Sequence, residues 1–284
     1  MDEDIRLKEG SIKGRELLRP RQPLLVLDAS TYDWIEIMVC GISHCYTFKA
    51  TRRMIDKALI VPDGSVDLLI NCTAGFPDFY FIGSPTRVVD IHYIKGIKEG
   101  DIVFGVRFLP GRAWWPDELP MDDLTDNGIP VHEICRDTRI MAAIAQEQDF
   151  IRQVQIFMTY YMDCYQREYR LSNRIRLSNA MVTTITQNKG MLSIRELAGK
   201  MGYTERYLNR VFHDAAGMSP KMFSEIIRFQ QVLRDIKDHT RIADISENLN
   251  YFDQSHLLKT FKRFVGMSPQ CYLKILSNQQ GIAV

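Results

Sequence analysis

The sequence predicts an α+β protein in which a β-rich first half is followed by a helical segment and an all-α C-terminal part. Short apolar runs separated by turn residues fill the chain to about Pro130. Glycine and proline are absent from Ile140 to Arg170, and a residue pattern repeats near the C-terminus. We therefore divide the chain into a β-rich domain (1–134), a helical segment (135–172) and a helical domain (173–284).

Composition is that of ordinary globular protein. The 284 residues are 45% hydrophobic and 25% charged, enough for about two domains. No apolar run approaches the ~18 residues that span a bilayer, and the start MDEDIRLKEG lacks the layout of a signal peptide. The six cysteines form no CxxC pair. We expect a cytoplasmic protein with no membrane partner, no metal and no cofactor.

Charge is distributed unevenly along the chain. Arg174 to Lys274 contains 16 Lys and Arg against 9 Asp and Glu, a net charge of +7, whereas the remainder carries −6. Such asymmetry indicates a basic module that meets polyanions, joined to an acidic module that does not. A solvated basic face would give the same count.

The first half alternates between apolar runs and turns. Turns are indicated at residues 62–64, 75–77, 83–85 and 110–111. Strands are predicted at LLVLDA, WIEIMVCGI, VDLLINC, FYFIG and IVFGVRFL. Strands at roughly ten-residue spacing predict a sandwich or a barrel.

Helical periodicity follows. Ile151, Val154, Met158, Tyr161 and Tyr165 are spaced 3, 4, 3 and 4 residues apart, which places them on one stripe of a helix. The sequence leaves two interpretations open: a helix packed on its own domain, or a dimerisation contact. The second interpretation predicts a homodimer.

The strongest feature is an internal repeat near the C-terminus. RVFHDAAGMSPKMF (210–223) aligns with KTFKRFVGMSPQCY (259–272) at an offset of 49 residues. The glycine of each GMSP can adopt the left-handed conformation that ends a helix, and Ser-Pro then begins the next helix. A short helix and a tight turn, at Gly202-Tyr203 and Asn250-Tyr251, precede the copies. This is the pattern of two helix-turn-helix units joined by a helix.

The second helix of each unit has an apolar face and an outward face. The residues expected in the core are Leu208, Val211, Phe212, Leu257, Phe261 and Phe264. The outward stripes are Arg206, Asn209, Arg210 and His213, then Ser255, Leu258, Lys259 and Lys262. These residue types suit base edges and phosphates. One such stripe could be an ordinary solvated face, but two in register indicate binding of double-stranded DNA.

At these residues the chain resembles the AraC/XylS family of bacterial transcription regulators, over about residues 177–276. IADISENLNYFDQSHLLKTFKRFVGMSPQCY (242–272) resembles the family's second-unit motif, with Ser246 and Asn250 where Ala and Gly are commoner. The resemblance implies a bridging helix at Pro220–Lys237 and recognition helices in successive major grooves, ~34 Å apart. Positions that match the family's base contacts are Arg206, Asn209, Arg210, Gln254, Ser255, Leu258 and Lys259.

The resemblance also implies a function. It predicts a sequence-specific regulator of promoter DNA, with activation as the family's commoner outcome and RNA polymerase as a further partner. VPDGSVDLLINC (61–72) and GVRFLPGRAWW (105–115) look like pieces of the sensory domains of some relatives. Such domains are often cupin-like, and they bind a small effector or mediate dimerisation. A cupin-like barrel or sandwich is therefore expected in the first half.

An effector in the β-rich domain would be lined by polar and aromatic groups on strands. The candidates are His44, Tyr46, Arg52, His92, Tyr93, Arg107, Trp114 and Trp115. Each has a plainer interpretation, because a single Tyr or Trp usually belongs to the core and a single Arg to the surface. Arg107 interrupts an apolar strand, so it needs an anionic partner from the protein or from a ligand.

Two other functional classes fit less well. An enzyme is not indicated, because the sequence has no Ser-His-Asp order, phosphate-binding Gly loop, zinc signature or PCHR-type cysteine. The alternative is an architectural or constitutive DNA-binding protein without an effector, since such proteins read DNA shape. The acidic, β-rich first half favours a switchable regulator.

Overall fold

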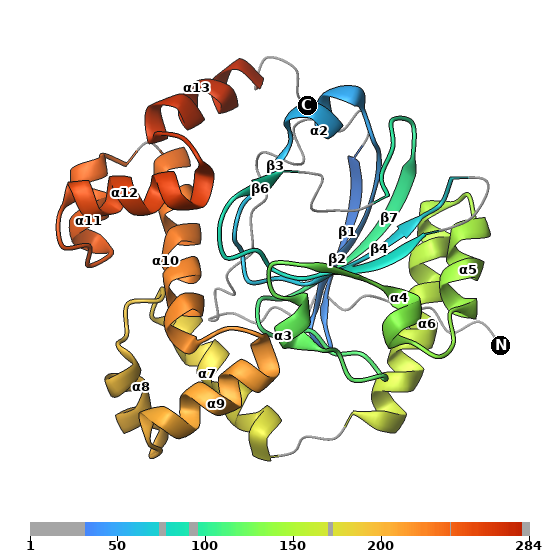
Figure 1. Ribbon diagram of the computed structural model, residues 1–284, viewed down its shortest axis with the longest axis horizontal. Helices are drawn as coiled ribbons and strands as arrows, with labels where there is room; N and C mark the ends of the chain where they lie inside the picture. The colour runs from blue at the N-terminus through green and yellow to red at the C-terminus, as the bar shows by residue number, and fades with distance from the viewer. Residues whose placement is uncertain (1–31, 74–77, 91–95, 170–172, 239, 280–284) are drawn as a thin grey trace.

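The computed structural model describes residues 32–73, 78–90, 96–169, 173–238 and 240–279 (Figure 1). The expected strand LLVLDA and the effector candidates His92 and Tyr93 lie outside these ranges. The α+β class is confirmed, with an antiparallel sheet in the first half and helices in the second. In the described part of the chain, no helix has the length and apolar character needed to cross a membrane.

The main sheet has six antiparallel strands in the order β1-β2-β7-β4-β5-β8, and β3 pairs with β6 in a second, two-stranded sheet. The strands are β1 Tyr32–Val39, β2 Ile42–Lys49, β3 Leu59–Ile60, β4 Asp67–Asn71, β5 Phe79–Ile82, β6 Val89–Asp90, β7 Ile102–Phe108 and β8 Gly128–Pro130.

Both faces of the main sheet are buried, and side chains alternate between them. On β7, Phe104 and Phe108 face the core beneath helices α5 (Arg139–Gln146) and α6 (Phe150–Glu168), seen beside the sheet in Figure 1. Val103 faces the other core, beneath helix α2 (Arg52–Lys57) and strand β3. Arg107, four residues after Val103, projects to the same second face.

The apolar stripe of α6 packs against its own domain. Of its five residues, Ile151 is exposed, at 50%. The other four belong to the core on the first face of the sheet: Val154, Met158, Tyr161 and Tyr165. Val154 and Tyr161 are buried and Met158 and Tyr165 are half-buried, so this packing does not test the dimerisation contact, which stays a prediction. The other interpretation, a helix packed on its own domain, describes α6.

The second half is helical, and the bridging helix has the bounds that were expected. Two short helices, α3 Met121–Leu124 and α4 Val131–Ile134, precede α5. The C-terminal helices are α7 Asn173–Gln187, α8 Ile194–Met201, α9 Glu205–Ala216, α10 Pro220–Lys237, α11 Ile242–Asn248, α12 Gln254–Val265 and α13 Pro269–Gln279.

The repeat produces the turns that it predicts. Gly217 and Gly266 end α9 and α12 with φ of 68° and 79°, and Asn250 takes φ of 53° between α11 and α12. The Ser219 hydroxyl then accepts a hydrogen bond from the Met222 amide at the start of α10. Two helix-turn-helix units, α8-α9 and α11-α12, therefore stand on either side of α10.

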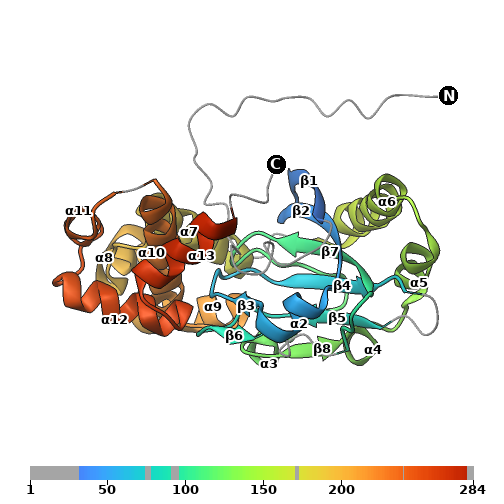
Figure 2. The same cartoon turned by 90° about the horizontal axis from the view of Figure 1, so that it is seen from above.

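The two halves of the protein share an interface (Figure 2). Helix α3 lies against α9, and the Thr125 hydroxyl donates to the Gly217 carbonyl at 2.8 Å. Val61 belongs to the core of the C-terminal helices, and the Gln230 side-chain amide of α10 donates to the Pro62 carbonyl at 2.8 Å. Residues of the sheet half therefore pack against the helical half and complete part of its core.

We expect Gly217→Ala to destabilise the protein by more than the control Gly202→Ala. Both glycines have positive φ, 68° and 72°, which costs an L residue about 1 kcal/mol. A Cβ on Gly217 would also lie 2.0 Å from the Met121 carbonyl oxygen, whereas the space around Gly202 is open. Urea unfolding should show a loss of about 2–4 kcal/mol for Gly217→Ala. Equal losses would contradict the interface between α3 and α9.

Candidate nucleic-acid interface

Helices α9 and α12 begin at side-chain caps. The Thr204 hydroxyl accepts from the Tyr207 amide at 3.3 Å, and the Asp253 carboxylate accepts from the His256 amide at 2.6 Å. The residues that were expected in the core are buried: Leu208, Val211, Phe212, Leu257, Phe261 and Phe264. The opposite faces of both helices are therefore left to solvent.

The outward stripe of α9 is accessible at its N-terminal end. Arg206 and Arg210 are exposed, whereas Asn209 is half-buried and donates its Nδ2 to the Glu205 carbonyl at 2.8 Å. Exposed His213, at the other end, lies 3.0 Å from an Asp122 carboxylate oxygen on α3. The C-terminal end of this stripe thus touches the sheet half.

The outward stripe of α12 is exposed along its whole length. Its residues are Gln254, Ser255, Leu258, Lys259 and Lys262. Leu258 has 41% of its surface exposed among these polar neighbours, and an apolar group in that place suits a thymine methyl. Helices α9 and α12 both lie toward the lower side of the helical half in Figure 2.

Three aromatic residues at the turns were missed by the sequence reasoning. The Tyr203 ring stacks on Tyr207 at 5.2 Å, and the Arg210 guanidinium lies 5.4 Å from the Tyr207 ring centre. Phe252, directly before the Asp253 cap, is 92% exposed. Helical periodicity could not find them, because two of the three lie outside the helices. The signal available was an aromatic residue beside each turn.

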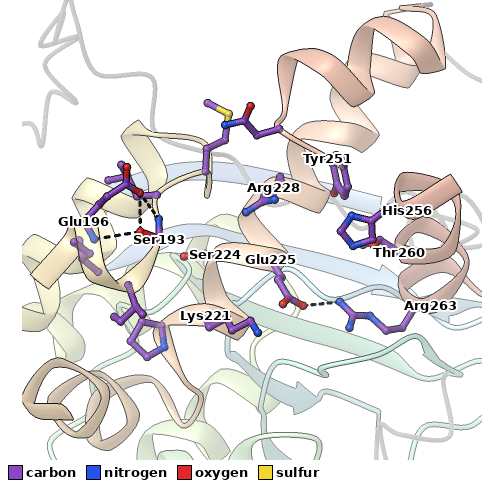
Figure 3. A pocket seen from close by; sticks show the side chains of 16 residues that line it. Ser193, Glu196, Lys221, Ser224, Glu225, Arg228, Tyr251, His256, Thr260 and Arg263 are labelled. Atoms are coloured by element: carbon purple, nitrogen blue, oxygen red, sulfur yellow. Dashed lines mark hydrogen bonds and ion pairs between the residues drawn. The ribbon is translucent and has the colours of Figure 1, made fainter. Parts of the chain in front are cut away.

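A groove of about 770 Å³ separates the two units (Figure 3). Its walls are the start of α8, the first turns of α10, the turn at Asn250-Tyr251 and one flank of α12. The charged side chains that line it are Glu196, Lys221, Glu225, Arg228 and Arg263. The sequence did not predict this groove because its residues come from separate elements.

Arg107 finds its anionic partners within the protein. Its guanidinium donates to both carboxylate oxygens of Asp67, at 3.0 and 2.7 Å, and to Asp63 at 2.9 Å. Burial lowers the pKa of Arg107, but Asp67 and Asp63 outweigh it and raise the pKa well above its usual value. The cavity beside this cluster measures about 20 Å³, room for about one water molecule. The anionic partner that Arg107 needs is therefore supplied by the protein and not by a ligand.

His44 and Tyr46 join Arg107 on the second face of the sheet. His44 lies opposite Arg107 in the strand register, and the Tyr46 hydroxyl donates to Asp67 at 2.9 Å. Burial and the Arg107 charge lower the pKa of His44 to about 4, against an opposing effect of Asp67. Tyr46, Asp67 and Arg107 thus form one connected polar cluster, and the His44 ring lies beside it, 5.6 Å from the Tyr46 ring centre.

The remaining described candidates do not join that cluster, which corrects the prediction of one shared lining. Trp115 is buried in the core on the other face, and Trp114 packs edge-on against Tyr165 of α6 at 5.0 Å. Arg52 is exposed and pairs with Asp56 at 3.1 Å. Both tryptophans follow the end of β7 in a segment without regular structure, and Arg52 lies on the surface helix α2, so none of the three lies on a strand beside Arg107.

The loop at residues 61–65 links the polar cluster to the helical half. Asp63 is held by Arg107, and the Gly64 amide donates to the Ser84 hydroxyl at 2.9 Å. The preceding residues, Val61 and Pro62, contact the C-terminal helices as described above. The interior of the sheet domain is therefore connected to α10 by a few residues.

Comparison with known proteins identifies the helical half. Residues 197–275 match the family described as Helix-turn-helix domain. YidL of Escherichia coli K12, an uncharacterised HTH-type transcriptional regulator, is 29% identical over 29% of this chain and 28% of its own length. The HTH-type transcriptional activator AarP of Providencia stuartii is 27% identical over 38% of this chain and 81% of its own length.

Other similarities are more distant. The chain spans 28% and 35% of the length of two HTH-type regulators that it matches, from Escherichia coli and Haemophilus influenzae. Among solved structures, ToxT from Vibrio cholerae aligns with a TM-score of 0.37 and 11% identity, over 86% of this chain and 96% of that chain.

We expect His44 to make the protein sensitive to acid. Because the pKa of His44 is about 4 in the folded protein and about 6.5 in an unfolded chain, its contribution to stability is complete above pH 6.5. It is lost as the pH falls from 6.5 towards 4, by about 1–3 kcal/mol. Urea unfolding at several pH values should show this loss in wild type and a flatter profile in His44→Gln. The exposed-residue control His132→Gln should keep the wild-type profile. Identical profiles for all three proteins would contradict the assignment.

Proposed function

We propose that this chain, whose C-terminal half carries a helix-turn-helix domain of the AraC type, is a sequence-specific DNA-binding regulator of transcription controlled by its N-terminal half. The observation that carries the proposal is the pair of outward stripes on α9 and α12, which lie at equivalent positions of a repeated fold and are exposed except at half-buried Asn209. A regulator of this kind would meet its promoter in the cytoplasm.

In the proposed complex each unit reads one half-site. Arg206, Asn209 and Arg210 of α9 read one major groove, and Gln254, Ser255, Leu258 and Lys259 of α12 read the next. For Asn209 to pair with adenine, its Nδ2 must leave the Glu205 carbonyl. Lys262, His213 and the net positive charge of this half position the domain on phosphates.

Control passes through the interface between the halves. An effector or a second copy of the chain that favours one arrangement of loop 61–65 or of α3 would shift the balance between DNA-binding states. The relative AarP is named an activator, which supports activation, with RNA polymerase as the further partner. A homodimer would use the accessible part of the α6 stripe, which includes Ile151, or another surface.

The closed polar cluster favours a second candidate, a regulator that binds DNA without a small effector. The charge of Arg107 is matched by Asp63 and Asp67, and the adjacent cavity has room for about one water molecule. A constitutive regulator would have the same DNA interface and would respond to no small molecule.

Direct titration tests the DNA-binding proposal. Full-length protein is titrated by fluorescence anisotropy against DNA selected from a random pool, with random DNA as competitor, at two salt concentrations. Arg210→Ala and Lys259→Ala should each weaken specific binding by about 1–3 kcal/mol. Arg167→Ala, on α6, is the control and should leave it unchanged. Equal competition by random DNA, with no loss in either variant, would contradict sequence-specific reading.

Asp122→Asn tests control by the sheet half. The substitution removes the carboxylate that contacts His213, and with it one negative charge beside the proposed DNA surface. Because both changes favour phosphate contact, DNA affinity should rise by an amount equivalent to about 0.2–1 kcal/mol at low salt, and by less at high salt. The matched control is Asp137→Asn, between α4 and α5. A fall in affinity for Asp122→Asn, or an equal rise in both variants, would contradict this role of α3.

A further inference from the structure

We propose that Arg228 and the Glu225–Arg263 ion pair fix the angle between the two helix-turn-helix units and thereby select the spacing of the DNA half-sites. The inference rests on the proposed function and adds residues that contact no base. All three side chains line the groove between the units (Figure 3).

Arg228, on α10, contacts the loop before the first unit and the turn of the second unit. Its Nε and Nη2 donate to the Gly190 carbonyl, which precedes α8, at 3.3 and 2.9 Å. The same guanidinium lies 5.6 Å from the ring centre of Tyr251, in the turn of the second unit. Arg228 therefore connects the entry to the first unit with the turn of the second.

The backbone at Gly190, to which Arg228 donates, packs tightly against α10. A Cβ on Gly190 would lie 2.1 Å from the Ser224 carbonyl oxygen, so the Gly190 backbone lies directly against α10. The first unit thus has a fixed position on α10, and Arg228 projects from that position towards Tyr251.

The second connection is ionic. Arg263 of α12 donates to the Glu225 carboxylate of α10 at 2.7 Å. The Arg263 guanidinium also lies 4.3 Å from the ring centre of Phe264, which restricts its direction. The pair joins the flank of the second recognition helix to the bridging helix.

These polar contacts define an angle that the apolar core does not define alone. Phe229 of α10 packs against Phe261 and Phe264 with ring centres 6.0 and 4.8 Å away. Apolar contact depends little on direction, whereas a charge-assisted hydrogen bond depends strongly on it. Rotation of the second unit about α10 would keep most of the aromatic contact but break the Arg263 and Tyr251 contacts.

The angle matters because DNA is helical. Each added base pair moves a half-site by about 3.4 Å along the axis and about 35° around it. A rigid pair of units can follow such a change only by deforming the DNA, whose cost is substantial. A protein with a fixed angle should therefore bind one spacing much better than its neighbours.

The experiment uses the full-length protein and an operator selected from random DNA. Binding is measured on a series of this operator with the half-sites moved by −2 to +2 base pairs. Wild type should lose at least about tenfold in affinity for a one-base-pair shift. The variants Glu225→Gln and Arg228→Lys should keep a native circular dichroism spectrum. For a one-base-pair shift they should lose no more than about threefold in affinity, because the second unit can rotate.

Two further variants make the result specific. Lys221→Gln removes a cation from the same groove but none of the contacts above. Any loss of DNA affinity in this variant should therefore be equal at every half-site spacing. The charge swap Glu225→Arg with Arg263→Glu should restore the narrow wild-type preference.

The outcomes separate the two proposals. Failure to select any operator would contradict the proposed function. An operator bound by wild type, with folded Glu225→Gln and Arg228→Lys proteins that keep the tenfold preference, would overturn this inference alone. If Arg228→Lys does not fold, the same test is decided by Glu225→Gln, whose side chain is 30% exposed.

Discussion

The ion pairs of Arg107 with Asp63 and Asp67 constrain the protein well beyond the sheet in which they lie. A buried guanidinium that loses a carboxylate partner leaves an uncompensated charge, at a cost of about 3–5 kcal/mol, so the three side chains keep one arrangement. Asp63 belongs to the loop at residues 61–65, and the same loop places Val61 in the core of the C-terminal helices. The loop that the polar cluster holds in the first half thus also packs against the second half.

Helix α10 distributes that constraint. Three successive residues of α10 make these contacts. Gln230 contacts the loop at residues 61–65, Phe229 packs against the second unit, and Arg228 contacts the loop before the first unit. In the proposed regulator, a displacement of the loop would reach both recognition helices, because a helix is nearly rigid over this length. Coupling between an N-terminal signal and DNA reading then needs no contact between the sheet and α12, only two stable positions of α10.

Much of the helical half was predictable because its signals are local. The GMSP repeat sets Gly217 and Gly266 at positive φ, and periodicity separates the buried face of α12 from Lys259 and its neighbours. The stripe of α6 shows the limit of local signals, since a period of 3.6 residues predicts that one face of a helix is covered but does not say what covers it. The effector candidates do not form one set, because Arg107 lies on β7, Arg52 lies on the surface helix α2, and Trp115 packs in the core on the other face of the sheet.

The sequence by itself determined the α+β class, the two helix-turn-helix units and the outward faces of α9 and α12. Those features follow from periodicity and turn chemistry, which act over a few residues. Only the tertiary structure decided that Arg107 is neutralised by Asp63 and Asp67, that α3 contacts α9, and that Arg228 connects both units across a groove. Each of these joins residues far apart in the chain, and packing, rather than local propensity, selects which of them meet.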